Sequence, residues 1–139
     1  DYIAPFGLVD FMTIVEKRDD ESLKEDLTSQ VMVKVIVGGK EVHTAATGNG
    51  PVNALDHALR KALLGYYPEL EKVSLTDYKV RVVDRQIGTD AVVRVLIEST
   101  DGENTWSTVG SSQNIIEASW MALVDSVEWW LLKHSKVVE

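Results

Sequence analysis

An internal repeat is the sequence feature that most constrains the fold of this chain. Three segments of the first half recur, in the same order, in the second half. The matched segments are Asp10–Arg18 with Asp77–Arg85, Val33–Val37 with Val93–Ile97, and Asn53–Leu59 with Glu117–Leu123. Several matches in one order indicate a duplicated supersecondary unit rather than chance similarity. We therefore expect two copies of one structural unit.

The first copy is predicted to contain three strands followed by a helix. A strand is expected at Phe11–Lys17, which is rich in β-branched and apolar residues, and another at Val31–Val37, where valines alternate with a period of two. Gly38-Gly39 supplies a tight turn into a third strand at Glu41–Ala46. Pro51 suits the first position of a helix, where a missing N–H costs nothing. One apolar stripe follows at helical spacing: Leu55, Ala58, Leu59, Ala62 and Leu63. Gly65 is expected to cap the end of this helix.

The second copy repeats the pattern. Strands are predicted at Tyr78–Asp84 and Ala91–Glu98, and Asp101-Gly102 is the expected hairpin turn before Trp106. Asn114 followed by Glu117 resembles a capping box that opens a helix running to about His134. Its predicted apolar stripe is Ile116, Trp120, Leu123, Val124, Val127 and Leu131.

Runs of strands before each helix indicate an α+β fold with mainly antiparallel sheets backed by helices. We expect one domain over residues 1–139, built from two βββα units related by a pseudo-twofold axis, at about 8–66 and 73–134. The charged segment Asp19–Asp26 is interpreted as the loop between the first two strands.

Composition narrows the possible functions. A formal net charge of −8 disfavours nucleic-acid binding, which needs a basic surface. No apolar run approaches the ~18 residues of a membrane helix, so no membrane contact is expected. The chain has no cysteine, which excludes disulfides and thiolate chemistry and fits a reducing cytoplasm, although other compartments would fit as well.

The residues of acid–base and metal chemistry form no recognisable site. His43, His57 and His134 have no ligand spacing around them, so surface roles are favoured over a metal or general-base role. Ser111-Ser112 lacks the G-x-S-x-G elbow of a nucleophilic serine. The residues alone therefore favour a binding or oligomerisation module without a catalytic residue or a metal site.

Two helix starts are candidate sites for a small carboxylate. Gly48-Asn49-Gly50 precedes the first helix, and Gly110–Asn114, with Ser112 and Asn114, precedes the second. Helix N-termini expose free N–H groups and a positive dipole end, which favour anions. The alternative is that both are ordinary, well-capped helix starts.

Gly88-Thr89-Asp90-Ala91 connects two predicted strands and is the second candidate element. Asp90 could accept a hydrogen bond from an ammonium group, or it could order the turn.

The adjacent Trp129 and Trp130 lie about 100° apart on a helix, so both can hardly enter one small core. We expect a dimer interface there; packing beneath the chain's own loops is the alternative.

Several motifs resemble one family. They are Gly48-Asn49-Gly50-Pro51, Gly88-Thr89-Asp90-Ala91, Thr105–Gly110 and Ile115-Ile116-Glu117-Ala118-Ser119-Trp120. Together they are similar to the C-terminal allosteric domain of the 2-isopropylmalate synthase superfamily. Within it, the sequences of these motifs are nearest to those of (R)-citramalate synthases. The resemblance covers about residues 5 to 134 and implies two βββα units in a homodimer.

The resemblance also implies a regulatory role. Parent synthases condense acetyl-CoA with a 2-oxo acid on a metal-dependent (β/α)8 barrel, which would precede this domain in the same polypeptide and is absent here. No cofactor is expected in the domain itself, because the divalent metal would bind the barrel. Such domains bind a branched-chain amino acid that inhibits the barrel: isoleucine for citramalate synthase, leucine for isopropylmalate synthase.

In the family the effector lies between the two units near the dimer interface. Part of that site is a strand connection with the pattern Gly-x-Asp-Ala, which Gly88, Asp90 and Ala91 match here. An earlier glycine of some leucine-sensing members is replaced by Gln86. We hypothesise that Asp90 or nearby carbonyls hold the ammonium group. N–H groups at the helix starts would hold the carboxylate. A leucine sensor, and a dimerisation module without effector binding, are the alternatives.

Overall fold

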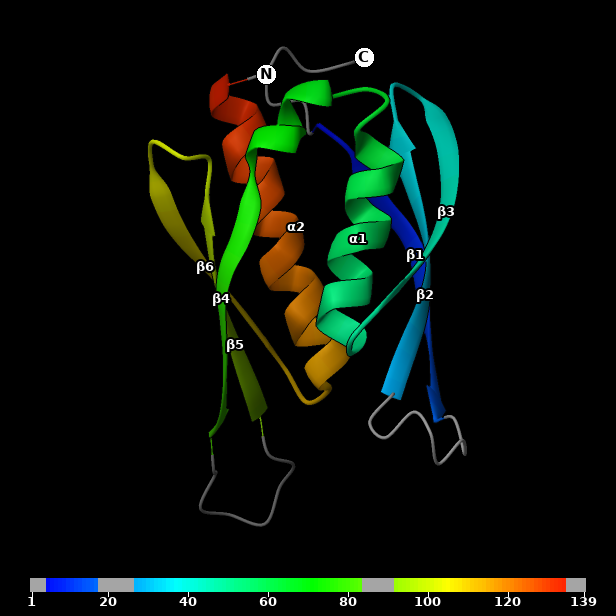
Figure 1. Ribbon diagram of the computed structural model, residues 1–139, viewed down its shortest axis with the longest axis vertical. Helices are drawn as coiled ribbons and strands as arrows, with labels where there is room; N and C mark the ends of the chain where they lie inside the picture. The colour runs from blue at the N-terminus through cyan, green and yellow to red at the C-terminus, as the bar shows by residue number, and fades with distance from the viewer. Residues whose placement is uncertain (1–4, 18–26, 84–91, 135–139) are drawn as a thin grey trace, which may run out of the picture. The chain divides into compact units, whose positions relative to one another are not determined.

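The computed structural model describes residues 5–17, 27–83 and 92–134 (Figure 1). The chain divides into two compact units, one within Asp1–Pro68 and the other within Glu69–Ser135. Each unit has three strands and then a long helix. In order, the elements are β1 (Gly7–Lys17), β2 (Leu27–Val37), β3 (Lys40–Gly48), α1 (Pro51–Leu63), the 3-10 helix η1 (Pro68–Lys72), β4 (Ser74–Val83), β5 (Val92–Thr100), β6 (Thr105–Ser112) and α2 (Ile115–His134). The predicted α+β class of two βββα units is confirmed.

The first unit is an antiparallel sheet, β1-β2-β3, with α1 packed on one side of it. Strand β2 is central, and its alternate residues from Val31 to Val37 are fully buried against the helix. The predicted stripe of α1 is buried as well. Thr44 of β3 donates a hydrogen bond of 2.8 Å to the carbonyl oxygen of Ala58, which fixes the helix along the strand.

The second unit repeats this arrangement with β4-β5-β6 and α2. Val95 and Ile97 of β5 are buried, as are Trp120, Leu123, Val127 and Leu131 of α2. Thr108 of β6 donates a 2.7 Å hydrogen bond to the Ala122 carbonyl. The expected turn forms at Asp101-Gly102, where Gly102 has φ +94.

Equivalent contacts define how the two copies align, and they correct one sequence match. Thr44 pairs with Val33 in the first sheet, and Thr108 pairs with Ile97 in the second. Val33 is therefore equivalent to Ile97 and not to Val93, so the predicted strand match was wrong by four residues. The matches of β1 with β4 and of α1 with α2 agree with the register.

The sheets share two features that the sequence patterns did not predict. A β-bulge interrupts β1 between Leu8 and Asp10 and β4 between Leu75 and Asp77, at equivalent places. The helices also approach their third strands closely. A Cβ at Gly48 would lie 2.7 Å from the Ala54 amide nitrogen, and one at Gly110 would overlap the Ala118 carbonyl oxygen. Glycine at both positions permits this packing.

The end of α1 differs from the prediction at Gly65. The capping residue is Leu64, with φ −59 and ψ −30, and Gly65 does not take a positive φ. The amides of Tyr66 and Tyr67 both donate to the Leu63 carbonyl, which satisfies the helix end without a left-handed glycine. The helix α2 reaches His134, the last residue that the structure describes there. The Asp19–Asp26 segment lies outside the described residues.

Candidate functional site

The start of α1 lacks a capping side chain. Gly50 is the N-cap residue, with φ +103 and ψ 160, and no side-chain hydrogen bond closes the first turn. Pro51 has no N–H, so the amides of Val52 and Asn53 are the first-turn donors that have no intrahelical acceptor. These donors and the positive end of the helix dipole are suited to an anionic group.

A buried hydroxyl lies beside this helix start. Ser29 of β2 pairs with Gly48, whose backbone touches the first turn of α1. Ser29 is 0% exposed, and its Oγ has no hydrogen-bond partner. It continues the alternation of Val31 and Val33, so it lies on the side of the sheet that α1 covers. An unpaired buried hydroxyl costs about 1–3 kcal/mol, which a ligand atom could recover.

The start of α2 is closed by its own side chains. Asn114 Oδ1 accepts hydrogen bonds from the amides of Ile116, at 2.7 Å, and Glu117, at 3.4 Å. Ser112 Oγ accepts from the Asn114 amide and donates to the Glu117 carboxylate. The reciprocal arm of the predicted capping box therefore runs through Ser112. With its donors occupied and a carboxylate beside it, this start offers little to an anion.

The structure therefore does not treat the predicted site residues alike. Gly48, Asn49 and Gly50 form the open start of α1, while Ser112 and Asn114 close the start of α2. Gly88, Thr89, Asp90 and Ala91 lie outside the described residues. Sequence reasoning missed Ser29, although the period of two that includes Val31 extends back to it.

The histidines have local partners. His43 Nε2 lies 2.8 Å from Glu41 Oε1 on the exposed side of β3, and His57 Nδ1 donates to the Thr47 carbonyl over 3.1 Å. Lys61 Nζ donates to the Ala45 carbonyl over 3.2 Å. His57 and Lys61 thereby occupy two outward carbonyls of the edge strand β3. Beside Lys61 lies an open cavity of about 460 Å³, lined also by Gln30, Met32 and Thr47.

Trp129 and Trp130 both pack against their own unit. Trp130 is buried and donates from Nε1 to Asp101 Oδ2 over 2.9 Å. This bond, with those from the Asn104 and Glu103 amides, lowers the pKa of Asp101 to about 2. Trp129 stays 39% exposed; its ring lies 5.2 Å from that of Trp106, and Lys133 lies over its face. Trp130 therefore packs against the chain's own hairpin turn, which was the alternative to a dimer interface.

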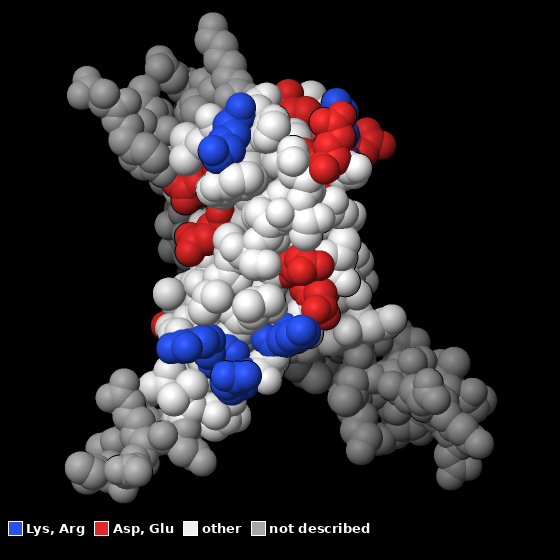
Figure 2. Space-filling model, turned by 90° about the vertical axis from the view of Figure 1, so that its left-hand side faces the viewer, with Lys and Arg blue, Asp and Glu red and all other residues white. Residues whose placement is uncertain are grey.

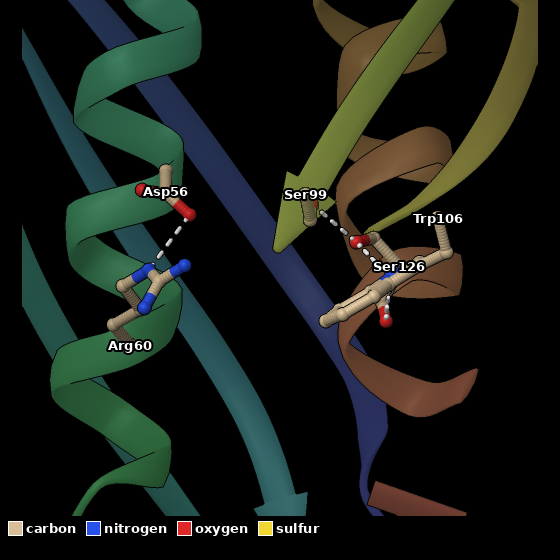
Figure 3. Close-up of polar contacts among 5 residues, drawn as sticks. All are labelled: Asp56, Arg60, Ser99, Trp106 and Ser126. Carbon is tan, nitrogen blue, oxygen red and sulfur yellow. Dashed lines mark hydrogen bonds and ion pairs between the residues drawn. The ribbon is translucent and has the colours of Figure 1, made fainter. Parts of the chain in front are cut away.

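The buried polar groups of the second unit are joined in a network (Figure 3). Ser126 Oγ on α2 lies 2.8 Å from Ser99 Oγ on β5, and Trp106 Nε1 donates to it over 3.0 Å. On α1, Asp56 and Arg60 form an ion pair of 3.0 Å with side chains only 14% and 18% exposed. Ser29 contrasts with these buried groups, since each of them has a partner.

Among the residues whose side chains the structure describes, 5–7, 29–83 and 92–134, no group of three or more His, Asp or Glu side chains is placed to hold a metal ion. Neither described helix is long and apolar enough to cross a membrane.

Duplicated βββα units and an open helix start are features of an α+β module for ligand binding or association. Residues 9–131 match the family described as the LeuA allosteric (dimerisation) domain, and the chain belongs to this family. It is 52% identical over 138 residues to an (R)-citramalate synthase of Aquifex aeolicus, covering 94% of this chain and 26% of the relative.

Other relatives place the chain within the superfamily. An (R)-citramalate synthase of Geobacter sulfurreducens is 52% identical over 132 residues, covering 95% of this chain and 24% of the relative. A 2-isopropylmalate synthase of Shewanella frigidimarina is 35% identical over 92 residues, covering 66% of this chain and 16% of the relative. The chain spans about a quarter of the length of the citramalate synthases it matches.

Proposed function

We propose that this chain is the amino-acid-binding regulatory domain of an acetyl-CoA-dependent citramalate synthase, and that isoleucine is its feedback effector. The observation that carries the proposal is the gap in similarity: 52% identity to citramalate synthases against 35% to a 2-isopropylmalate synthase, with the family described as allosteric. A regulatory domain acts by binding its effector more tightly in one state of the parent enzyme than in another.

The start of α1 is the proposed carboxylate site. The amides of Val52 and Asn53 supply two donors on the helix axis, and the Ser29 hydroxyl supplies a third near Gly48. An α-carboxylate has enough acceptor lone pairs for all three. Binding there would give the helix the cap that its own sequence lacks.

The Gly88–Ala91 segment is the proposed site for the ammonium group. Asp90 carries the charge that an ammonium needs, and Gly88 leaves room for the ligand's backbone. Gly88→Asp is expected to abolish effector binding while the fold persists, and unchanged binding by calorimetry would remove this segment from the site.

We also propose that a homodimer forms over the helix-facing side of the second sheet. Val80 and Val82 lie on that side because they pair with Val95 and Val93, yet Val82 is 59% exposed. The helix α2 packs mainly against β6 and β5, so it leaves these valines of the edge strand β4 uncovered. Exposed valines next to a core favour burial by another surface.

The test is titration of the chain with isoleucine, leucine and valine, followed by melting temperature and then by calorimetry. A ligand that binds only the native state stabilises it by about 2.7 kcal/mol at one hundred times its dissociation constant. Selective stabilisation by isoleucine is the expected result. Selective stabilisation by leucine would assign the parent enzyme to 2-isopropylmalate synthesis. No response to any of the three would favour a dimerisation module without effector binding.

A further inference from the structure

Strand β6 is an edge of the second sheet that lacks the usual protection against pairing with a further strand. Edge strands are commonly protected by charged side chains, by β-bulges or by cover from another element. Among the strands that the structure describes, the edges are β1, β3, β4 and β6. Bulges interrupt β1 and β4, and charged residues occur in β1, β3 and β4. Strand β6 contains no charged residue, and it pairs with β5 without a bulge.

The corresponding edge of the first unit is covered by its helix. Lys61 Nζ and His57 Nδ1 of α1 donate to the outward carbonyls of Ala45 and Thr47 on β3. The spacings match, because four residues of a helix rise about 6 Å and two residues of a strand span about 6.7 Å. These contacts occupy acceptors that an added strand would need.

The same places in the second unit are taken by residues that cannot cover the edge. The threonine bonds from β3 to α1 and from β6 to α2 align the two units residue by residue. On the edge strand, Val109 and Ser111 take the places whose carbonyls are covered in β3. On the helix, Met121 and Asp125 take the places of the two covering side chains. Neither a thioether nor an ionised carboxylate can donate, and among the described residues no other side chain donates to these two carbonyls.

The backbone groups of Val109 and Ser111 point away from β5. The Asp101 amide donates to the Asn104 carbonyl, so the ladder of β5 and β6 begins with a hydrogen-bonded pair at the turn. Hydrogen-bonded and non-hydrogen-bonded pairs alternate along an antiparallel ladder. Counted from the turn, Val109 and Ser111 fall at non-hydrogen-bonded positions, which leaves their N–H and C=O groups at the open edge.

The surroundings of this edge are apolar on both sides of the sheet and acidic at one point. Met121, on the helix side, is 42% exposed, and Val109, on the other side, is 45% exposed. Burial raises the pKa of the Asp125 carboxyl, and the charge of Glu128 adds to the rise. A cation beside Asp125 would stabilise its ionised form.

The described part of the chain does not supply that cation. None of its ion pairs includes Asp125. In Figure 2 the basic side chains gather mainly at one end of the side shown, and much of the surface between the two ends carries no charged side chain. A partner that brings its own basic residue would therefore complement this edge.

We infer that the β6 edge binds an extended polypeptide segment, which adds a strand to the second sheet and places a lysine or arginine beside Asp125. Backbone hydrogen bonds at Val109 and Ser111 would supply affinity, and the side chains on either side of the sheet would supply selectivity. A second copy of β6 does not fit, because β6 has no basic residue to offer. The edge lies across the sheet from β4, and neither the proposed effector nor the proposed dimer enters the inference.

Fluorescence anisotropy tests the inference with a short labelled peptide in which threonine alternates with valine around one central lysine. The chain is expected to bind this peptide, and to bind its glutamate counterpart at least about fivefold more weakly, because glutamate repels the Asp125 carboxylate. Amide hydrogen exchange at Val109 and Ser111 should slow on binding. Absence of binding, equal binding of the two peptides, or protection confined to other amides would overturn the inference.

Two variants separate the open edge from its charge. Met121→His with Asp125→Lys transfers the covering pair of the first unit to the second, and should weaken binding of the lysine peptide at least about tenfold. Asp125→Asn should still bind, but without preference between the two peptides. Glu71→Lys is the matched control, because it makes the same change of charge at an exposed position of η1, and it should bind as the wild type does.

Both altered helix positions are exposed, so the fold should persist. Circular dichroism identifies a double variant that fails to fold, in which case Asp125→Asn still tests the charge. Wild-type affinity in the folded double variant, or an equal loss of affinity in Glu71→Lys, would contradict the site. Protection of Val109 and Ser111 that needs no peptide and grows with protein concentration would overturn the inference in favour of a second copy.

Discussion

At the scale of single residues, the contrast between Ser29 and Ser99 separates the hydroxyl proposed to bind the effector from a structural one. Both are buried serines of a central strand, but only Ser99 has a hydrogen-bond partner, Ser126. Removing a paired hydroxyl loses its hydrogen bond, whereas removing an unpaired one loses nothing in the ligand-free protein.

Ser29→Ala is therefore expected to leave the free energy of unfolding of the ligand-free protein unchanged or raised, within about 1 kcal/mol. The same variant should bind isoleucine about tenfold more weakly, because a hydrogen bond to a charged carboxylate is lost. Urea unfolding and calorimetry measure the two effects. Ser99→Ala is the control; it should lower stability and spare affinity. Full affinity in Ser29→Ala would place the carboxylate elsewhere.

Asp101 gives a pH-dependent contribution to stability. Its pKa is lowered from 3.8 to about 2, chiefly by the Trp130 indole N–H. Because the folded-state pKa is the lower one, the ionised form stabilises the fold above about pH 4, and this contribution is lost as pH falls towards 2. In Trp130→Phe the Asp101 pKa should return towards its usual value.

The difference in melting temperature between wild type and Trp130→Phe should therefore shrink as pH falls from about 5 to 2. Part of the difference will persist, since the smaller ring also packs less well. Thermal scans across this range, with the Asp101 carboxyl followed by NMR, test the assignment. A difference that is constant with pH would mean that the indole–carboxylate bond contributes nothing.

At the scale of elements, each helix is held against its third strand by a glycine and a threonine. Gly110→Ala should cost about 1–3 kcal/mol, because its Cβ overlaps the Ala118 carbonyl, which belongs to the helix backbone and cannot turn aside. Gly65→Ala is the control, since nothing lies within 4 Å of its Cβ position and its φ is not positive. Denaturant melts of both variants measure the costs; equal costs would contradict the close approach.

The two helix starts make a second prediction at this scale. Bound isoleucine should slow amide exchange in the first turn of α1, around Val52 and Asn53, while the first turn of α2 exchanges as before because Asn114 and Ser112 already cap it. Hydrogen exchange with and without isoleucine compares both turns in one sample. Equal protection of both turns, or protection of α2 alone, would contradict the proposed carboxylate site.

The sequence patterns predicted the elements better than their registration. The stripe from Leu55 to Leu63 and the turn at Asp101 could be predicted because helical periodicity and turn residues are local properties. The alignment of Val33 could not, because a period of two looks the same after a shift of four residues. The bulges near Asp10 and Asp77 were missed for a similar reason, since they depend on pairing with another strand.

At the scale of the whole molecule, the sequence predicted the number of units and their order, but not how they differ. The resemblance in Gly48–Gly50 and Ser112–Asn114 treats the two helix starts alike. Only the hydrogen bonds of the folded chain separate them, because Ser112, Asn114 and Glu117 close one start together. The two copies therefore have the same order of elements and differ in how their helix starts are capped.

Gly50 has a consequence for how this protein can change over generations. Its φ of +103 with ψ 160 lies in a region that only glycine occupies without strain. Placing Asn, Asp, Ser or Thr there to cap α1 would meet that backbone penalty before any hydrogen bond formed. Single mutations at Gly50 that would close the proposed carboxylate site by self-capping are therefore penalised by folding itself. The open start of α1 is therefore protected against mutational drift at this position, even in a lineage without a ligand for it.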